Sequence, residues 1–144
     1  MKLLTRILAV SGLLFLVLFL FAFYLTHIPG GEKIMQKKQL IAKMLQDKYH
    51  TSAYLIISEK RPHWYNDLLP NAVDDSYHLK GMAVDFWVMD LNGDNSWDVQ
   101  DINLMVKTIK EVEEEHPELA GGTYTYLNKS RLTSRMVHTD VRIH

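Results

Sequence analysis

Two segments of the chain place histidine and aspartate side chains where they could bind a metal ion. His78 comes just before a β-prone run, and Asp85 lies a few residues inside that run. Further along, His138 lies within a second β-prone segment with Asp140 two positions later, so these two side chains share one face of a strand. Two histidines and one carboxylate form a three-ligand set that leaves a fourth position open for water, as a catalytic zinc ion requires.

The composition decides which ligands such a site can use. The chain has no cysteine, which excludes disulfides, cysteine-ligated zinc and thiol catalysis and leaves histidine and carboxylates as ligands. It has seven histidines, so accidental pairs are common, and a surface or hydrogen-bonded imidazole is the alternative for each of them. The formal net charge of -1 predicts no nucleic-acid partner, because nucleic-acid-binding domains carry basic patches.

The same segments resemble a known enzyme family. SYHLKGMAVDFWV, residues 76–88, is similar to the SxHxxGxAxD signature of M15-type zinc peptidases, the D-alanyl-D-alanine carboxypeptidase-like and murein endopeptidase family. MVHTDVR, residues 136–142, resembles the closing His-x-Asp strand of their small domains. Less specific similarities lie in ISEKRPHWYND and GGTYTYL, and the whole resemblance covers about residues 39–144.

This resemblance implies a set of site residues. Zinc would be bound by His78, Asp85 and His138, and Arg61 would neutralise the oxyanion that develops on the substrate. Ser76 would support a zinc ligand without binding the metal itself. Taken alone, Arg61 also fits an exposed surface arginine, and Ser76 fits an ordinary loop serine.

The general base departs from the family pattern. Members of the family carry Glu or His two or three residues before the last zinc histidine, where this chain has Met136 and Arg135. Neither side chain takes a proton from water at neutral pH. Asp140 is the replacement base that the sequence offers, and it could equally orient a metal ligand. Three other histidines become candidates only if the fold brings them near: His63, His116 and His144.

A second metal-binding pattern spans residues 90–101. Oxygen-bearing side chains occupy positions 1, 3, 5, 7, 9 and 12 of a twelve-residue loop, as in a calcium-binding EF-hand: Asp90, Asn92, Asp94, Ser96, Asp98 and Asp101. Asn95 at position 6 suits the positive φ that this turn requires, and aspartate in place of glutamate at position 12 resembles dockerin-type loops. Because a strand precedes the loop, calcium would be a structural clip. The alternative is a polar turn in which Asp98 caps the following helix.

The N-terminal segment has the length and composition of a membrane anchor. Residues 7–26, ILAVSGLLFLVLFLFAFYLT, carry no charge, and about 20 apolar residues in a helix cover a hydrocarbon core of about 30 Å. We expect residues 1–6 to stay in the cytoplasm, because Lys2 and Arg6 precede the segment. A cleaved signal would be shorter and end in a small-x-small site, so an uncleaved anchor is favoured. A linker at 27–31 and a domain at 32–144 in the periplasm or extracytoplasmic space would follow.

The remaining pattern predicts one small α+β domain. Apolar residues at helical spacing predict amphipathic helices at 32–49 and 101–115, and short β-prone runs predict strands at 53–57, 82–89, 123–127 and 135–143. Residues 58–75 form a loop-rich stretch with two prolines. This order predicts a small, mainly antiparallel sheet with flanking helices, preceded by one transmembrane helix.

These expectations combine into one functional hypothesis and two alternatives. We expect a zinc-dependent hydrolase that cleaves peptide bonds in peptidoglycan stem peptides or cross-links, either as a carboxypeptidase or as an endopeptidase. The first alternative is a non-catalytic metal-binding cell-wall module that keeps the fold, as the missing base would indicate. The second is a phage or plasmid lysis enzyme whose N-terminal segment acts as an export signal.

Overall fold

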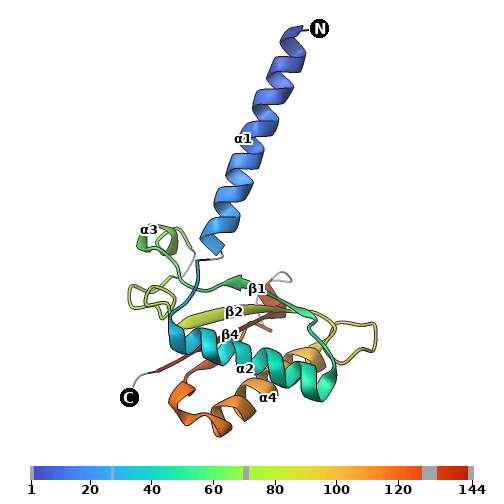
Figure 1. The fold of residues 1–144 in the computed structure, drawn as a ribbon, viewed down its shortest axis with the longest axis vertical. Helices are drawn as coiled ribbons and strands as arrows, with labels where there is room; N and C mark the ends of the chain where they lie inside the picture. Colours follow the sequence, from blue (N-terminus) through green and yellow to red (C-terminus); the bar gives the residue numbers. More distant parts are fainter. Residues whose placement is uncertain (1, 27, 70–71, 128–132, 143–144) are drawn as a thin grey trace.

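The computed structural model of the chain describes residues 2–26, 28–69, 72–127 and 133–142. An N-terminal helix is followed by a four-stranded antiparallel sheet with helices packed against it (Figure 1). The strands are β1 (Tyr54–Ser58), β2 (Ala83–Val88), β3 (Thr123–Thr125) and β4 (Met136–Asp140), in the order β1-β2-β4-β3. The predicted α+β class with a small antiparallel sheet is therefore confirmed.

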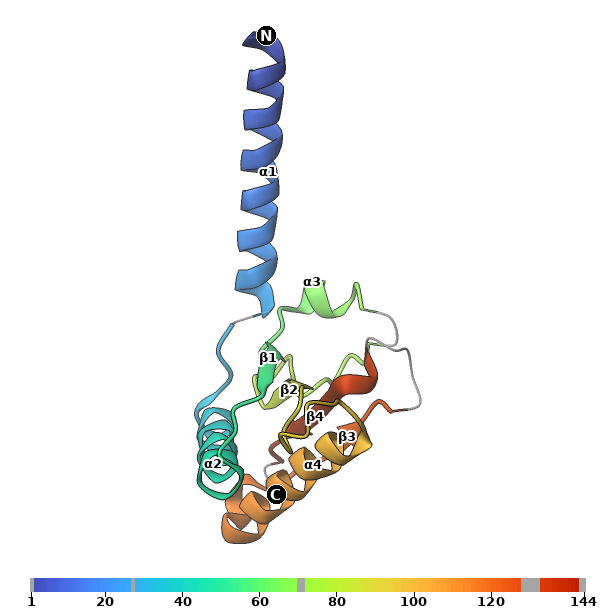
Figure 2. The same cartoon turned by 90° about the vertical axis from the view of Figure 1, so that its right-hand side faces the viewer.

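The two faces of the central strands have different environments. In β2, Val84, Phe86 and Val88 are fully buried and belong to one core with α2 (Glu32–Tyr49) and α4 (Val99–Glu115). Both helices cover the same face of the sheet (Figure 2). Because successive side chains on a strand point to opposite faces, Asp85 lies on the other face. The core therefore occupies one side of the sheet and leaves the other side for polar side chains.

The two long helices form because apolar residues recur at the helical period, as predicted. Their fully buried apolar residues are Ile34, Ile41 and Leu45 in α2, and Ile102, Met105, Ile109 and Val112 in α4. α4 begins two residues earlier than expected because Asp98 is its N-cap. The Asp98 side chain accepts a hydrogen bond from the backbone N–H of Gln100, and Asp101 completes a capping box.

Some predicted elements differ in extent. The loop-rich stretch 58–75 contains a short helix, α3 (His63–Asn66), because the Pro62 carbonyl accepts hydrogen bonds from the two backbone N–H groups that close its first turn. The predicted strand 123–127 is paired only over β3. The predicted strand 135–143 begins with a 3-10 turn, η2 (Thr133–Arg135), and pairs only over β4, while residue 143 lies outside the described residues. A further 3-10 turn, η1 (Pro117–Leu119), follows α4.

The N-terminal helix α1 (Lys2–Thr26) projects away from the sheet and its helices (Figures 1 and 2). All of residues 10–21 are exposed, although most of them are apolar. Among the residues whose side chains the structure describes, no helix is both long and apolar enough to cross a membrane. The predicted membrane segment 7–26 includes side chains outside that description, at 7–9, 22–23 and 25–26. Membrane insertion therefore stays a prediction.

The structure describes residues 28–31 of the predicted linker 27–31, and these residues contact the domain. Gly30 donates its backbone N–H to Glu59 Oε2 at 2.9 Å, and Gly31 donates to the Gly81 carbonyl at 2.7 Å. A Cβ atom on Gly30 would lie 2.3 Å from Ile34 Cγ2, so a larger residue there would force the Ile34 side chain to shift. Residue 27 lies outside the described residues. Residues 28–31 therefore belong to the folded domain.

Candidate metal centre

The central pair of strands brings Asp85 and His138 together. Asp85 on β2 and His138 on β4 are direct partners in the antiparallel register. Directly opposed side chains on one sheet face lie within contact distance. Both side chains lie on the face turned away from the α2 and α4 core, and β2 and β4 supply two of the three expected ligands.

The third ligand comes from a tight turn just before β2. Leu79 N–H donates to the Ser76 carbonyl at 3.0 Å and Gly81 N–H donates to the His78 carbonyl at 3.1 Å. Gly81 has a φ of +67°, a conformation that favours glycine. Ser76 Oγ accepts the backbone N–H of His78 at 3.3 Å. Ser76 thus supports His78 through its backbone, which gives a physical reason for the spacing of Ser, His and Gly in residues 76–81.

The three side chains converge on one point. His138 Nδ1 lies 2.9 Å from Asp85 Oδ1 and 3.2 Å from His78 Nε2, and His78 Nε2 lies 3.2 Å from Asp85 Oδ2. Ligand atoms at the corners of a tetrahedron with metal bonds of about 2.0 Å are about 3.3 Å apart. Among the described residues this is the one group of three or more histidine or carboxylate side chains close enough to hold a metal ion.

The second ring nitrogen of His78 is held by a hydrogen bond, and the second ring nitrogen of His138 faces a carboxylate. His78 Nδ1 lies 2.5 Å from the main-chain carbonyl of Glu59, a contact in which the nitrogen donates its proton. His138 Nε2 lies 3.7 Å from Asp140 Oδ2. Metal-binding histidines commonly have such a carbonyl or carboxylate partner, which fixes the ring and the tautomer. The two outer contacts leave His78 Nε2 and His138 Nδ1 facing the Asp85 carboxylate.

Arg61 belongs to this group and is not an exposed surface arginine. Its Nη2 contacts Asp85 Oδ2, and its Nε donates to Ser58 Oγ at 2.7 Å. Burial raises the pKa of Asp85. The hydrogen bonds from His138 and His78 and the charges of His78 and Arg61 lower it by more, so the pKa of this carboxyl lies well below its usual range. Asp85 is therefore ionised at neutral pH, as a metal ligand must be.

The contacts of Asp140 favour an orienting role over that of a general base. The carboxylate is 1% exposed. Its Oδ1 accepts hydrogen bonds from Gly122 N–H at 2.6 Å and from Arg142 Nε at 3.1 Å, while its Oδ2 faces His138. A base must reach a water molecule in the open part of the site, and although Asp140 lines the first pocket, its 1% exposure and these contacts leave little of the carboxylate for water.

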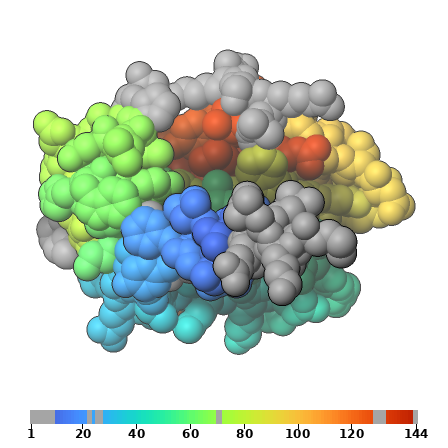
Figure 3. Space-filling view, turned by 90° about the horizontal axis from the view of Figure 1, so that it is seen from above, coloured from blue at the N-terminus to red at the C-terminus, as the bar shows by residue number. Residues whose placement is uncertain are grey.

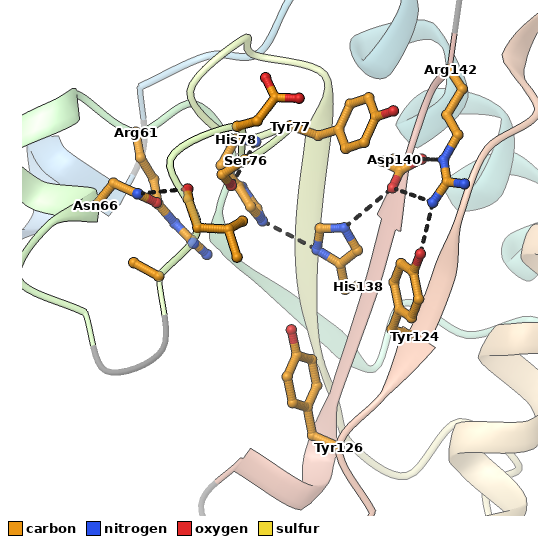
Figure 4. A pocket seen from close by; sticks show the side chains of 13 residues that line it. Arg61, Asn66, Ser76, Tyr77, His78, Tyr124, Tyr126, His138, Asp140 and Arg142 are labelled. Carbon is orange, nitrogen blue, oxygen red and sulfur yellow. Dashed lines mark hydrogen bonds and ion pairs between the residues drawn. The ribbon is translucent and has the colours of Figure 1, made fainter.

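Two adjoining pockets meet at the metal group. The first has a volume of about 330 Å³ and is lined by His78 and His138 (Figure 4). The second has a volume of about 420 Å³, is lined by Asp85, and shares Arg61 and Tyr126 with the first. The candidate ligands therefore line two pockets, which leaves room beside them for an extended ligand.

Tyr126 is a site residue that the sequence reasoning missed. It follows β3, lines both pockets and points toward the two histidines (Figure 4). Burial and the charge of Asp85 raise the pKa of Tyr126, and Arg61 opposes this shift. Its hydroxyl group therefore stays protonated at neutral pH. The signal that could have found it is the i, i+2 spacing of Tyr124 and Tyr126, which places both on one face of the same segment.

Of the other candidate histidines, the two that the structure describes do not join the group. His63 is exposed on α3, and His116 Nδ1 lies 3.3 Å from Glu118 Oε1 beyond the end of α4. His144 lies outside the described residues. Arg135 and Met136, which occupy the positions of the family base, do not supply one: the guanidinium of Arg135 lies over the Trp97 ring at 4.3 Å, and Met136 lines the second pocket.

The predicted calcium loop forms hydrogen-bonded turns. Asp90 accepts backbone N–H groups of Gly93, Asp94 and Asn95 at 2.7 to 3.1 Å, and Asn95 has the positive φ expected at position 6. Asp101 is fully buried and accepts three backbone N–H groups. The capped polar turn is therefore present. Of the other predicted ligands, the side chains of Asn92, Asp94 and Asp98 also accept backbone N–H groups within the loop or the helix cap.

The loop carboxylates do not lie close enough together to be a candidate metal-binding group. In the described part of the chain, such a group occurs only at His78, Asp85 and His138. The oxygens of the loop carboxylates accept backbone N–H groups of the loop and of the helix start. Calcium binding stays a prediction.

Comparisons of the chain with protein-family models, with curated proteins and with solved structures give no match.

Proposed function

We propose that the chain is a zinc-dependent peptidase that hydrolyses peptide bonds in peptidoglycan stem peptides or cross-links. The observation that carries this proposal is the meeting of His78 Nε2, His138 Nδ1 and the Asp85 carboxylate beside an open pocket. Two imidazoles and one carboxylate match the donor set of catalytic zinc, which keeps one position for water or substrate. The resemblance of residues 76–88 and 136–142 to M15-type peptidases supplies the substrate class.

The residues around the ligands can serve hydrolysis. Zinc held there would lower the pKa of a bound water and polarise the peptide carbonyl. Arg61 and Tyr126 line the same pocket and carry N–H and O–H donors that could stabilise negative charge on the carbonyl oxygen. Ser58 holds the Arg61 guanidinium in place. The ordering of these donors before the substrate arrives would favour the transition state over the bound substrate.

A non-catalytic metal-binding cell-wall module is the second candidate function. It is favoured by a specific observation: Asp140, the base that the sequence offered, directs its oxygens toward Gly122, Arg142 and His138. A protein with a metal site and without a base would bind peptidoglycan peptides and leave them intact. The two candidates share the metal centre and differ only in turnover.

The proposed location is at a membrane, with the domain outside the cytoplasm. Support comes from α1, whose residues 10–21 are exposed and mostly apolar and which extends away from the domain (Figure 3 views the molecule from the α1 side). Apolar side chains that no protein covers are energetically favourable in lipid.

Digestion of purified peptidoglycan tests the proposal. Full-length protein would be incubated with it in the presence of zinc or of a chelator, and the products would be identified by mass. Muropeptides shortened in a zinc-dependent manner, and absent with His138→Ala, support the peptidase. Intact peptidoglycan together with stoichiometric bound zinc would overturn it in favour of the binding module. His116→Ala is the matched control, because that histidine lies outside the metal group.

A further inference from the structure

The first pocket contains a second guanidinium that the chemistry above does not use. Arg142 lines the pocket on the side of His138 opposite Arg61 (Figure 4), and its side chain is 37% exposed. Asp140 Oδ2 lies 3.7 Å from His138 Nε2 and 3.4 Å from Arg142 Nη2. A single carboxylate oxygen therefore separates this guanidinium from a metal ligand.

Arg142 is held in one position by its neighbours. Its Nε donates to Asp140 Oδ1 at 3.1 Å, its Nη2 donates to Tyr124 Oη at 2.7 Å, and its guanidinium carbon lies 5.5 Å from the centre of the Tyr77 ring. A Cβ atom on Gly122 would lie 2.3 Å from Nη2, so glycine leaves the space that the guanidinium fills. Among the described residues, hydrogen bonds from Arg142 use Nε and Nη2, which leaves the Nη1 edge for a ligand.

We propose that Arg142 binds a carboxylate of the substrate one residue away from the reacting peptide bond, an inference that rests on the proposed peptidase function. A planar guanidinium matches a carboxylate in shape and charge, and a guanidinium fixed in advance loses little freedom when it binds. His78, His138 and Arg142 line the same pocket, so a substrate whose carbonyl lies at the two histidines can place the carboxylate of a neighbouring residue at Arg142.

Tyr124 extends this carboxylate site. Its hydroxyl oxygen accepts the Arg142 hydrogen bond, so its own proton is free to donate to the same ligand. The carboxylate could be the free terminal group of the leaving residue or a side-chain acid at that position. The two sources share this chemistry and can be separated by probes.

Binding of small probes tests the inference without turnover. N-acetyl-D-alanine, its C-terminal amide, and the α-amide of N-acetyl-D-glutamate would be titrated into full-length protein by calorimetry, with and without zinc. One of the acids should bind about 10- to 100-fold more tightly than the neutral amide, the range expected for a hydrogen bond to a charged group. Preference for the first acid assigns the terminal carboxylate, and preference for the second assigns a side-chain carboxylate.

Three variants separate a binding role for Arg142 from a structural one. Arg142→Met should abolish the preference for acid over amide. Gly122→Ala should also reduce it, because the new methyl group displaces the guanidinium while its charge remains. Tyr124→Phe, at a half-exposed residue, should reduce it about 10-fold with the fold intact, as circular dichroism would check. The matched control is Arg135→Met, which removes an arginine stacked on Trp97 outside the first pocket.

The outcomes separate this inference from the proposed function. Equal affinity for acids and amide in the wild type, or an unchanged preference in folded Arg142→Met, overturns the role of Arg142 even if peptidoglycan is cleaved. An acid preference that depends on Arg142 upholds it even if no peptide bond is hydrolysed, and in that case the peptidase proposal alone fails.

Discussion

Asp85 and His138 face each other across β2 and β4, with His138 Nδ1 2.9 Å from Asp85 Oδ1. His78 reaches the same carboxylate from the turn that leads into β2. A site divided between two paired strands forms only when the sheet is folded. Metal binding and folding are therefore expected to be coupled, because a metal that binds only the folded chain stabilises it.

Zinc should bind at about one ion per chain and raise the melting temperature, and His138→Ala should lose both effects because only two ligands remain. Elemental analysis and thermal unfolding measure these quantities. His116→Ala should behave like the wild type. Stoichiometric zinc in folded His138→Ala would show that the metal binds elsewhere.

Asp140→Asn should separate the two roles of this residue. If Asp140 orients His138, the variant should bind zinc about 10- to 100-fold more weakly. If it is the general base, zinc affinity should hold and turnover should fall by about 100-fold or more. The contacts at Oδ1 and Oδ2 favour the first result. Zinc titration and peptidoglycan cleavage would be measured on the same preparation, and unchanged zinc affinity contradicts the orienting role.

The elements that carry the candidate metal ligands were predictable because their sequence signals are local. β2 is a short apolar run with Asp85 at one internal position, and the turn before it needs glycine at residue 81. The helices follow from apolar residues at helical spacing. Residues 90–101 carried two overlapping signals, since Asp98 and Asp101 fit both a calcium loop and a capping box, and spacing alone could not separate them.

The partners that orient the ligands were less accessible from sequence. His78 is held by the main-chain carbonyl of Glu59, an atom that every residue carries, so no residue type marks it. Tyr126 and Arg142 enter the site through the pairing of distant segments. Whether Asp140 faces water or the protein also depends on the close packing of Gly121 and Gly122, where an added Cβ would lie 2.2 to 2.9 Å from its atoms.

If the loop at 90–101 binds calcium, calcium should raise the melting temperature. At a concentration one hundred times the dissociation constant, it should add about 2.7 kcal/mol to the free energy of unfolding. The gain should vanish in Asp94→Ala, and zinc content should not change. Thermal unfolding of protein first stripped with a calcium-selective chelator measures it. An unchanged melting temperature at millimolar calcium would leave only the capped polar turn.

Full-length protein should stay with membranes after carbonate and high-salt washing, because residues 7–26 form an uncharged apolar stretch of the length that spans a bilayer. Fractionation followed by mass determination of the N-terminus checks this. Release into the wash contradicts an anchor. A mature N-terminus near Gly30 would instead identify a cleaved signal.

Lys37 should give the folded domain a pH dependence opposite to that of surface lysines. It is fully buried within the core face of α2, and its Nζ donates to Glu113 Oε1 at 2.6 Å and to the Asp140 carbonyl at 2.7 Å. Burial lowers the pKa of Lys37, and the hydrogen bond and charge of Glu113 offset only part of that shift. Between this lowered pKa and the ordinary value of 10.5, the unfolded chain binds more protons than the folded chain.

Stability should therefore rise with pH through that window in the wild type relative to Lys37→Met, which lacks the titrating group. Urea unfolding at constant ionic strength, from about pH 8 toward pH 10.5, gives the difference in unfolding free energy between the two proteins. Lys48 is the matched control, because its hydrogen bond to Glu111 raises its pKa above 10.5 and its contribution to stability is lost only as pH rises beyond that value. Across the measured window the difference between the wild type and Lys48→Met should therefore stay nearly constant. The opposite result is a difference in unfolding free energy between the wild type and Lys37→Met that falls as pH rises. It would mean that the Glu113 pairing outweighs burial and that Lys37 is a stabilising cation in the core.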